Sequence, residues 1–246
     1  MKLPARFAGK VVDQVRSRGM VETVRHLLVV GRHHAHERLV PARCRELGPT
    51  AGKVELATLA VEGGNRSAGV HYLPTPWRVL EWVHALLPAD KAHLSFVDLG
   101  AGKGRAVLSA ALHSYAEVIG VEFAPALARI AQANVEGLPS GLIKAGSIAI
   151  RCEDAGATRL PEGPLVLFLF NPFGPPVIDR VADLLQSSYE ARRRPIWVAY
   201  LNPAHPAFER LACLEQVRPG RAARLRLQLA SPYNLALFAT REARRA

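Results

Sequence analysis

The hydrophobic and polar positions of this chain change their spacing near residue 72. Before it, apolar residues recur at helical spacing in two stretches, 11–15 and 21–28, which Gly19 separates. This spacing predicts two short helices. The segment 50–69 that follows is irregular, and VELATLAV within it fits a strand or a hairpin arm. We therefore expect residues 1–70 to form a basic, helical N-terminal extension.

From Thr75 onward, short apolar runs alternate with amphipathic stretches. Thr75 is expected to cap a helix in TPWRVLEWVHALL, with Pro76 at its first position. Strands are predicted at 95–99, 117–121, 148–152, 165–170 and 195–201, and helices from 105, at 124–134, at 177–190 and near 205–211. Segments 224–229 and 234–239 flank the turn ASPYN and predict an antiparallel pair. This alternation predicts a doubly wound, mostly parallel α/β sheet over 71–246.

The net charge changes the expected partners. The 246 residues are 49% hydrophobic, enough for a large core, and carry a formal net charge of +11. Such a charge favours an acidic macromolecule: nucleic acid, an anionic membrane surface or an acidic protein. The alternative is an arginine-rich but merely solvated surface, which the dispersal of the basic residues favours.

Cysteine usage and apolar run lengths indicate the compartment. The three cysteines, Cys44, Cys152 and Cys213, have no metal-ligand spacing, and their odd number argues against a disulfide framework. Residues 1–14 lack the apolar core of a signal peptide. No apolar run approaches the ~18 residues of a membrane span. We therefore expect a protein of the reducing cytoplasm, without a membrane span.

The stretch VDLGAGKG joins the first predicted strand to the following helix. Gly100, Gly102 and Gly104 let the backbone approach a ligand, and Ala101 lies between the first two. Two ligands fit such a turn, a dinucleotide and S-adenosylmethionine. Dinucleotide sites use G-x-G-x-x-G, whereas the spacing here is G-x-G-x-G. Asp98 would repel a pyrophosphate but attract an ammonium group, so the charge favours S-adenosylmethionine.

Acidic residues also end the next two predicted strands. Glu122 follows Gly100 by 22 residues, where a carboxylate can accept hydrogen bonds from both ribose hydroxyls. Asp154 ends the third strand in CEDAGA and is placed to accept from an adenine amine, with the Ala155 backbone beside it. A turn-capping role remains open for Asp154.

The fourth strand ends in LFLFNPFG, which indicates a substrate side. Asn171 is expected at the strand tip, facing the cleft, with Phe173 as a wall for a flat group. An amide cannot act as a base at neutral pH, but its oxygen can accept from an incoming amine and orient the nitrogen lone pair. A simple Asn-Pro turn is the alternative.

Together, VDLGAGKG, GVE, EDA and NPF resemble the class I, seven-strand, Rossmann-like S-adenosylmethionine-dependent methyltransferases over 72–240. The segment HYLPTPWRVLEWV is similar to an uncharacterised bacterial subgroup and to the lysine methyltransferases of this fold. The resemblance implies a seven-stranded sheet with a reversed last strand, and S-adenosyl-L-methionine as cofactor. It also implies that Tyr72 and Thr75 lie over the cofactor. Asn171 is then expected to orient the nucleophile, and Tyr72 to close the site or to hydrogen-bond the substrate.

The resemblance implies methyl transfer, with a nitrogen nucleophile expected on an acceptor that the sequence leaves open among protein lysine or amine, RNA and small molecule. A non-catalytic nucleic-acid-binding module of the same fold is one alternative, and an NAD-dependent oxidoreductase is another. The cluster HHAHE (His33, His34, His36 and Glu37) has metal-binding residue types, but local histidines seldom converge without a distant fourth ligand. We expect a solvated helix there and no metal.

Overall fold

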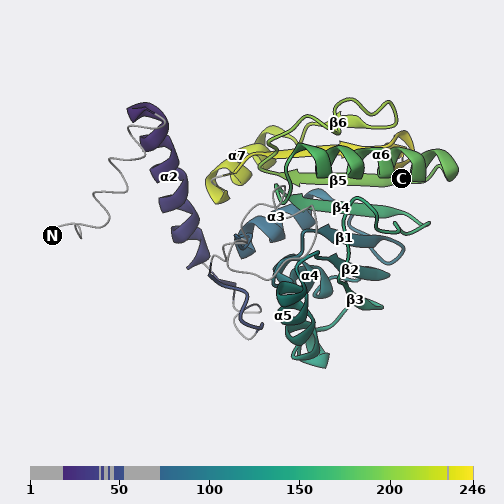
Figure 1. Ribbon diagram of the computed structural model, residues 1–246, viewed down its shortest axis with the longest axis horizontal. Helices are drawn as coiled ribbons and strands as arrows, with labels where there is room; N and C mark the ends of the chain where they lie inside the picture. Colours follow the sequence, from purple (N-terminus) through teal and green to yellow (C-terminus); the bar gives the residue numbers. More distant parts are fainter. Residues whose placement is uncertain are drawn as a thin grey trace.

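The computed structural model describes residues 19–38, 40–41, 44, 47–52, 73–231 and 233–245. In this part of the chain, seven strands form one sheet with helices against it (Figure 1). The strands are β1 (Ser95–Leu99), β2 (Glu117–Val121), β3 (Ile148–Arg151), β4 (Leu165–Phe170), β5 (Ile196–Leu201), β6 (Glu215–Val217) and β7 (Leu235–Ala239). The helices are α2 (Met20–Glu37), α3 (Trp77–Leu86), α4 (Arg105–Ala111), α5 (Pro125–Glu136), α6 (Pro175–Ala191), α7 (Arg221–Ala230) and α8 (Arg241–Arg245), with the 3-10 helix η4 (Ser140–Leu142).

The strand order is β3-β2-β1-β4-β5-β7-β6. The first five strands in this order pair in parallel, and β7 runs antiparallel to both β5 and β6. This confirms the predicted doubly wound, mostly parallel seven-stranded sheet with a reversed last strand. The chain winds outward from β1 to β3 on one side and from β4 on the other. A crevice is expected at the carboxyl ends of β1 and β4, where the winding direction changes.

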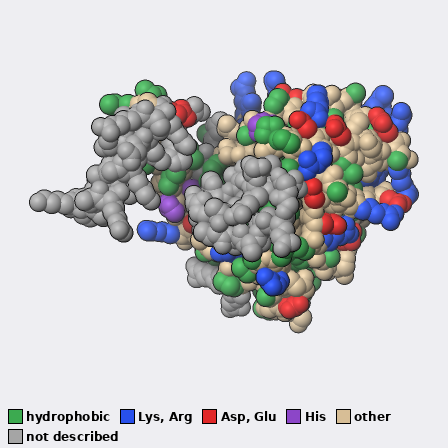
Figure 2. Space-filling model, in the orientation of Figure 1, with side chains coloured by type: hydrophobic (Ala, Val, Ile, Leu, Met, Phe, Trp, Pro, Cys, Tyr) green, Lys and Arg blue, Asp and Glu red, His purple; other side chains and the backbone are tan. Residues whose placement is uncertain are grey.

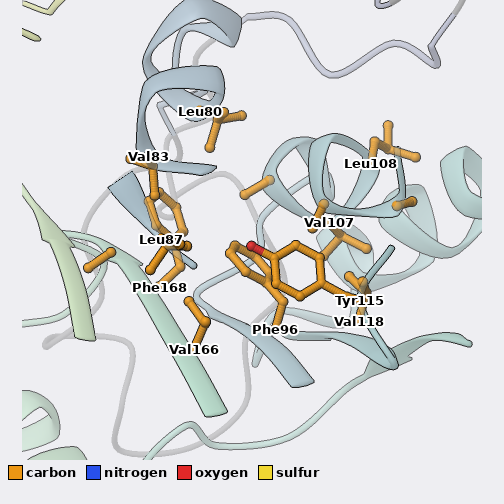
Figure 3. Packing of buried hydrophobic residues seen from close by; sticks show 14 of the residues in the cluster. Leu80, Val83, Leu87, Phe96, Val107, Leu108, Tyr115, Val118, Val166 and Phe168 are labelled. Carbon is orange, nitrogen blue, oxygen red and sulfur yellow. The ribbon is translucent and has the colours of Figure 1, made fainter. Parts of the chain in front are cut away.

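Two apolar clusters cover the two faces of the sheet. Helices α3 and α4 pack on one face, where Leu80 and Val107 lie near the aromatic side chains of Phe96 and Phe168 (Figure 3). Helix α6 packs on the other face, against Val97, Leu99 and their neighbours. Successive side chains of a strand point to opposite faces, so the Asp98 side chain shares the face of Phe96.

The segment 224–229, predicted as a strand, is helical. It lies within α7, and β7 instead pairs with β5 and with β6, a strand that the sequence did not predict. The residues of segment 224–229, RLRLQL, alternate between polar and apolar with the period of a strand. Arginine, leucine and glutamine are, however, also good helix formers. Because β7 already occupies the edge of β5, the segment packs as a helix against α3 through Leu227, which is buried.

Smaller differences occur at element ends. Pro76 takes the N-cap position of α3, and no side-chain hydrogen bond caps this helix, so the predicted cap at Thr75 is wrong. Hydrogen-bonded turns replace the predicted helix near 205–211. The second predicted N-terminal helix is confirmed as α2, which extends through the histidine cluster. The predictions for 11–15 and for VELATLAV lie outside the described residues.

Gly120 of β2 gives a test of how tightly the sheet packs under α4. A Cβ atom at this position would lie 2.7 Å from Val107 Cγ2 and 2.9 Å from Ile150 Cδ1. We expect Gly120→Ala to lower the free energy of unfolding by about 1–3 kcal/mol, as overpacking does. Among the described residues, no atom lies within 4 Å of the corresponding position at Gly163, so Gly163→Ala is the matched control. Urea denaturation that finds equal stability for the two variants would contradict this packing.

Candidate functional site

The glycine turn between β1 and α4 has a backbone shape that requires its glycines. Gly100, Gly102 and Gly104 have φ values of 82°, 56° and 83°, in the region that side chains disfavour. A Cβ at Gly100 would also lie 2.4 Å from Pro172 Cβ, at the tip of β4. The backbone N–H groups of Gly100 and Ala101 donate to the Val121 carbonyl at 2.9 and 3.0 Å, which holds the turn against β2.

Two carboxyl groups are buried beside this turn. Asp98 is the next-to-last residue of β1 and Glu122 directly follows β2, and each is only 4% exposed. The pKa of Asp98 is raised from 3.8 to about 8, chiefly by burial and to a smaller extent by the nearby charge of Glu122. Burial also raises the pKa of Glu122, although backbone hydrogen bonds oppose the shift. A buried pair of like charge is a favourable place for a cation, which would stabilise both ionised groups.

Backbone hydrogen bonds fix the position of Glu122. One carboxylate oxygen accepts from Gly102 N–H at 2.8 Å and the other from Ala124 N–H at 2.9 Å. The carboxylate therefore connects the glycine turn to the start of α5. This explains how the second strand orients the turn that follows the first.

A cavity of about 190 Å³ opens at the carboxyl ends of the strands. Seven of the predicted site residues line it: Thr75, Asp98, Gly100, Ala101, Gly102, Glu122 and Asn171. Gly104 is not among its lining residues; it lies against α5, where its Cβ would be 3.2 Å from Ala131 Cβ. Asp154 and Ala155 line an adjoining small hollow, which shares Phe123 and Phe173 with the cavity. Tyr72 lies outside the described residues.

The Asp154 carboxylate has partners within its own loop and from α6. It accepts from Gly156 N–H at 2.9 Å, the turn-capping role left open by the sequence, and forms an ion pair with Arg180 at 3.0 Å. The capping bond holds Ala155 next to Phe173 in the hollow. Asp154 thus shapes this part of the site whether or not a ligand contacts it directly.

The tips of β4 and β5 both end in an asparagine with an unusual backbone. Asn171 has a φ of 39° and Asn202 a φ of 53°, and they are the two non-glycine residues with positive φ in the described part of the chain. Both line the cavity. Tyr200 O–H donates to Asn171 Oδ1 at 3.3 Å, which orients the amide. Strained residues of this kind cluster at functional sites.

Arg105 is a site residue whose role the sequence did not reveal. It lies in the first turn of α4, is buried, and lines the cavity. Its guanidinium donates to Thr50 Oγ1 at 2.8 Å, to the Thr75 carbonyl at 3.1 Å and to the Glu37 carboxylate at the end of α2. Because these partners lie far apart in the sequence, no local pattern could have indicated this contact.

The histidine cluster contributes to the site through packing. His33 is buried, and its Nδ1 lies 2.8 Å from the hydroxyl of Tyr233, which lines the cavity. Glu37 pairs with Arg105, as above. The expected fully solvated helix is therefore wrong for these two side chains, because α2 packs on the body at this end. In the described part of the chain, no group of three or more His, Cys, Asp or Glu could hold a metal ion.

Chemically, the cavity combines buried carboxyl groups with strand-tip amides and aromatic walls. Among the described residues, Arg105 is the only Lys or Arg that lines the cavity, and its guanidinium is already bonded to a carboxylate, a hydroxyl and a carbonyl. The arrangement therefore suits a cationic ligand with flat and hydroxyl-bearing parts, rather than a phosphate. Within the described residues, no helix is long and apolar enough to cross a membrane.

The strand order and the reversed β7 are those of the class I methyltransferase fold. An RNA methyltransferase from Salinibacter ruber, solved with S-adenosyl-L-homocysteine, is 19% identical over 68% of this chain and 92% of its own, with a TM-score of 0.43. A SAM-dependent methyltransferase from Thiobacillus denitrificans, also solved with that ligand, is 17% identical over 69% and 92%, with a TM-score of 0.44. A predicted N6-adenine-specific DNA methylase from Listeria monocytogenes is 13% identical over 76% and 54%, with a TM-score of 0.47.

No protein-family model matches the chain, and no curated protein matches it significantly.

The pKa of Asp98 predicts an unusual pH dependence of stability. In the unfolded chain this carboxyl ionises near pH 4, whereas in the folded protein it stays neutral until about pH 8. Its contribution to stability is therefore lost as the pH rises through this window. We expect Asp98→Asn to be more stable than the wild type at pH 8, with a difference that grows by up to about 1.4 kcal/mol per pH unit from pH 5.

Urea denaturation of both proteins at pH 5, 6.5 and 8 measures this difference. Asp183→Asn is the control and should show no such trend, because this aspartate is exposed and its partner Arg210 stays charged over this pH range. A difference between Asp98→Asn and the wild type that is constant across the three pH values would contradict the buried, neutral Asp98.

Proposed function

We propose that this protein is an S-adenosylmethionine-dependent methyltransferase. The observation that carries the proposal is the pair of buried carboxyl groups beside a left-handed glycine turn, in a cavity at the switch point of the sheet. A dinucleotide would bring a pyrophosphate to Asp98, where its charge would oppose ionisation of this buried carboxyl and would be repelled by the ionised form. S-adenosylmethionine brings an ammonium and a sulfonium, and it has no phosphate.

The cofactor roles follow from the position of each residue. Asp98 would hold the ammonium group, with Gly100, Ala101, Gly102 and Gly104 allowing close approach of the backbone. Glu122 would accept from the ribose hydroxyls with the lone pairs that its backbone bonds leave available. The adenine would extend toward the hollow of Asp154 and Ala155, between Phe123 and Phe173. Thr75 lines the cavity from the segment before α3.

Bound S-adenosylmethionine supplies an activated methyl group, so the protein has to position the acceptor atom and exclude water. Asn171 is the residue we assign to this task. Burial raises the pKa of Tyr200, which therefore stays protonated and donates to Asn171 Oδ1. The same oxygen can accept a second hydrogen bond, from an N–H of the acceptor, and this orients the nitrogen lone pair toward the cofactor.

The acceptor is proposed to be a nitrogen nucleophile on a protein lysine or amine, an RNA or a small molecule. Tyr72, which precedes Thr75 by three residues, is proposed to close the site. We also propose that 71–246 form the catalytic domain and that 1–70 are an extension. The bonds of Arg105 to Glu37 and Thr50 support a role for that extension beside the cavity.

Two other functions are less well supported. A non-catalytic nucleic-acid-binding module would not need two buried carboxyl groups beside its glycine turn. Figure 2 also shows Lys and Arg side chains of the described residues interspersed with acidic ones on the face in view. An NAD-dependent oxidoreductase conflicts with Asp98 on the Coulombic ground given above.

Titration calorimetry tests the cofactor. We expect S-adenosylmethionine and S-adenosylhomocysteine to bind the wild type, and NADH not to bind. Asp98→Asn should lose at least about 1.4 kcal/mol of binding free energy, a factor of ten, and Asp90→Asn should lose none. Because the cation requires ionised Asp98, affinity should increase from pH 6 and level off near pH 8. Equal affinity of Asp98→Asn and wild type would refute the assignment.

Asn171→Gly tests the acceptor side separately from cofactor binding. Glycine tolerates the φ of 39°, so this variant removes the amide without straining the backbone. We expect calorimetry to give unchanged S-adenosylmethionine affinity, and methyl transfer from labelled cofactor to fractionated cell extract to fall about 10²-fold or more. Full transfer by Asn171→Gly would show that the amide does not orient the acceptor.

A further inference from the structure

Helix α7 presents two of its three leucines to solvent. Leu225 is 57% exposed and Leu229 is 69% exposed, and their spacing of four residues places them on one face of the helix. Leu227 lies on the opposite side and is buried against the body. The strand-like alternation of this segment, once wound into a helix, thus gives one leucine to the core and leaves two outside.

Arginines surround this leucine row. Arg221 lies one turn before Leu225 in the same row, while Arg224 and Arg226 are its neighbours in sequence and so lie about 100° to either side of it. All three arginines are exposed, and α7 contains no acidic residue. The Arg226 guanidinium lies 5.6 Å from the centre of the Trp82 ring on α3, which fixes one side of the helix to the body.

A second exposed apolar row lies at the same end of the molecule. Met20, Val21, Val24 and Leu28 of α2 are each more than half exposed. The two helices approach each other where Arg32 donates to the Ser231 carbonyl, directly after α7, at 3.0 Å (Figure 1). Exposed apolar rows of this kind on a chain of net charge +11 indicate an interaction surface.

We propose that α7 docks this protein on an anionic lipid surface. The leucine row would enter the boundary between headgroups and acyl chains, and Arg221 and Arg224 would contact the anionic headgroups. A nucleic acid would account for the arginines but not for the leucines between them. Docking through α7 would also bring the lipid surface near the cavity, because Tyr233, three residues after the helix, lines it. This surface is independent of the cofactor assignment.

Vesicle flotation with the full chain tests the proposal. We expect the wild type to float with vesicles of phosphatidylcholine and phosphatidylglycerol, and not with phosphatidylcholine alone. Leu225→Ser/Leu229→Ser and Arg221→Gln/Arg224→Gln should each lower the partition coefficient by about tenfold or more. Circular dichroism should show both variants folded, because all four side chains are exposed.

Two matched controls test whether the loss of any exposed apolar or basic side chains, rather than those of α7, lowers flotation. Ile130→Ser/Ile143→Ser removes two exposed apolar side chains elsewhere, and Arg241→Gln/Arg245→Gln removes two exposed arginines on α8. Both should float like the wild type. The proposal is overturned if the wild type does not float, or if the control variants lose as much flotation as the α7 variants. It is also overturned if the wild type binds single-stranded RNA but no vesicles, and Leu225→Ser/Leu229→Ser binds that RNA equally well.

Discussion

The burial of two neighbouring carboxyl groups, Asp98 and Glu122, is the constraint on which the site depends. Adjacent parallel strands end at the same edge of the sheet, so their terminal side chains meet there, away from water. Backbone N–H groups offset the cost for Glu122. Because the raised pKa keeps Asp98 uncharged near neutral pH, a positively charged ligand would favour its ionised form and an anion would oppose it.

The glycine turn is also connected to the N-terminal region. Arg105, directly after it, connects α4 to α2 through Glu37 and to the segment before α3 through the Thr75 carbonyl. At the far end of the same wall, His33 of α2 meets Tyr233. Helix α2 therefore contacts two residues that line the cavity, Arg105 and Tyr233, and a change in how α2 packs would reach these side chains.

The sequence predicted those features of the fold that the local pattern of apolar residues and the local charge determine. Strands β1, β2 and β4 were located to the residue, because buried parallel strands are continuous apolar runs bounded by turn residues. Asp98 and Glu122, predicted at the strand ends that meet at the switch point, both line the cavity. The prediction of a strand at 224–229 was wrong because β7 pairs with β5 and leaves no free edge of β5 for this segment. Arg105 and Asn202 were missed because their significance depends on contacts distant in sequence and on a backbone angle.

The two outermost strands show a further consequence of this architecture. β3 has four residues and β6 three, and the Glu215 side chain on β6 is paired with Arg244. An open sheet exposes unsatisfied backbone groups along its margins, where another chain could add as an extra strand. Such short margins, one of them carrying an ion pair, give an incoming strand few hydrogen bonds, so the molecule is protected against ordered aggregation at the same positions where its sheet ends.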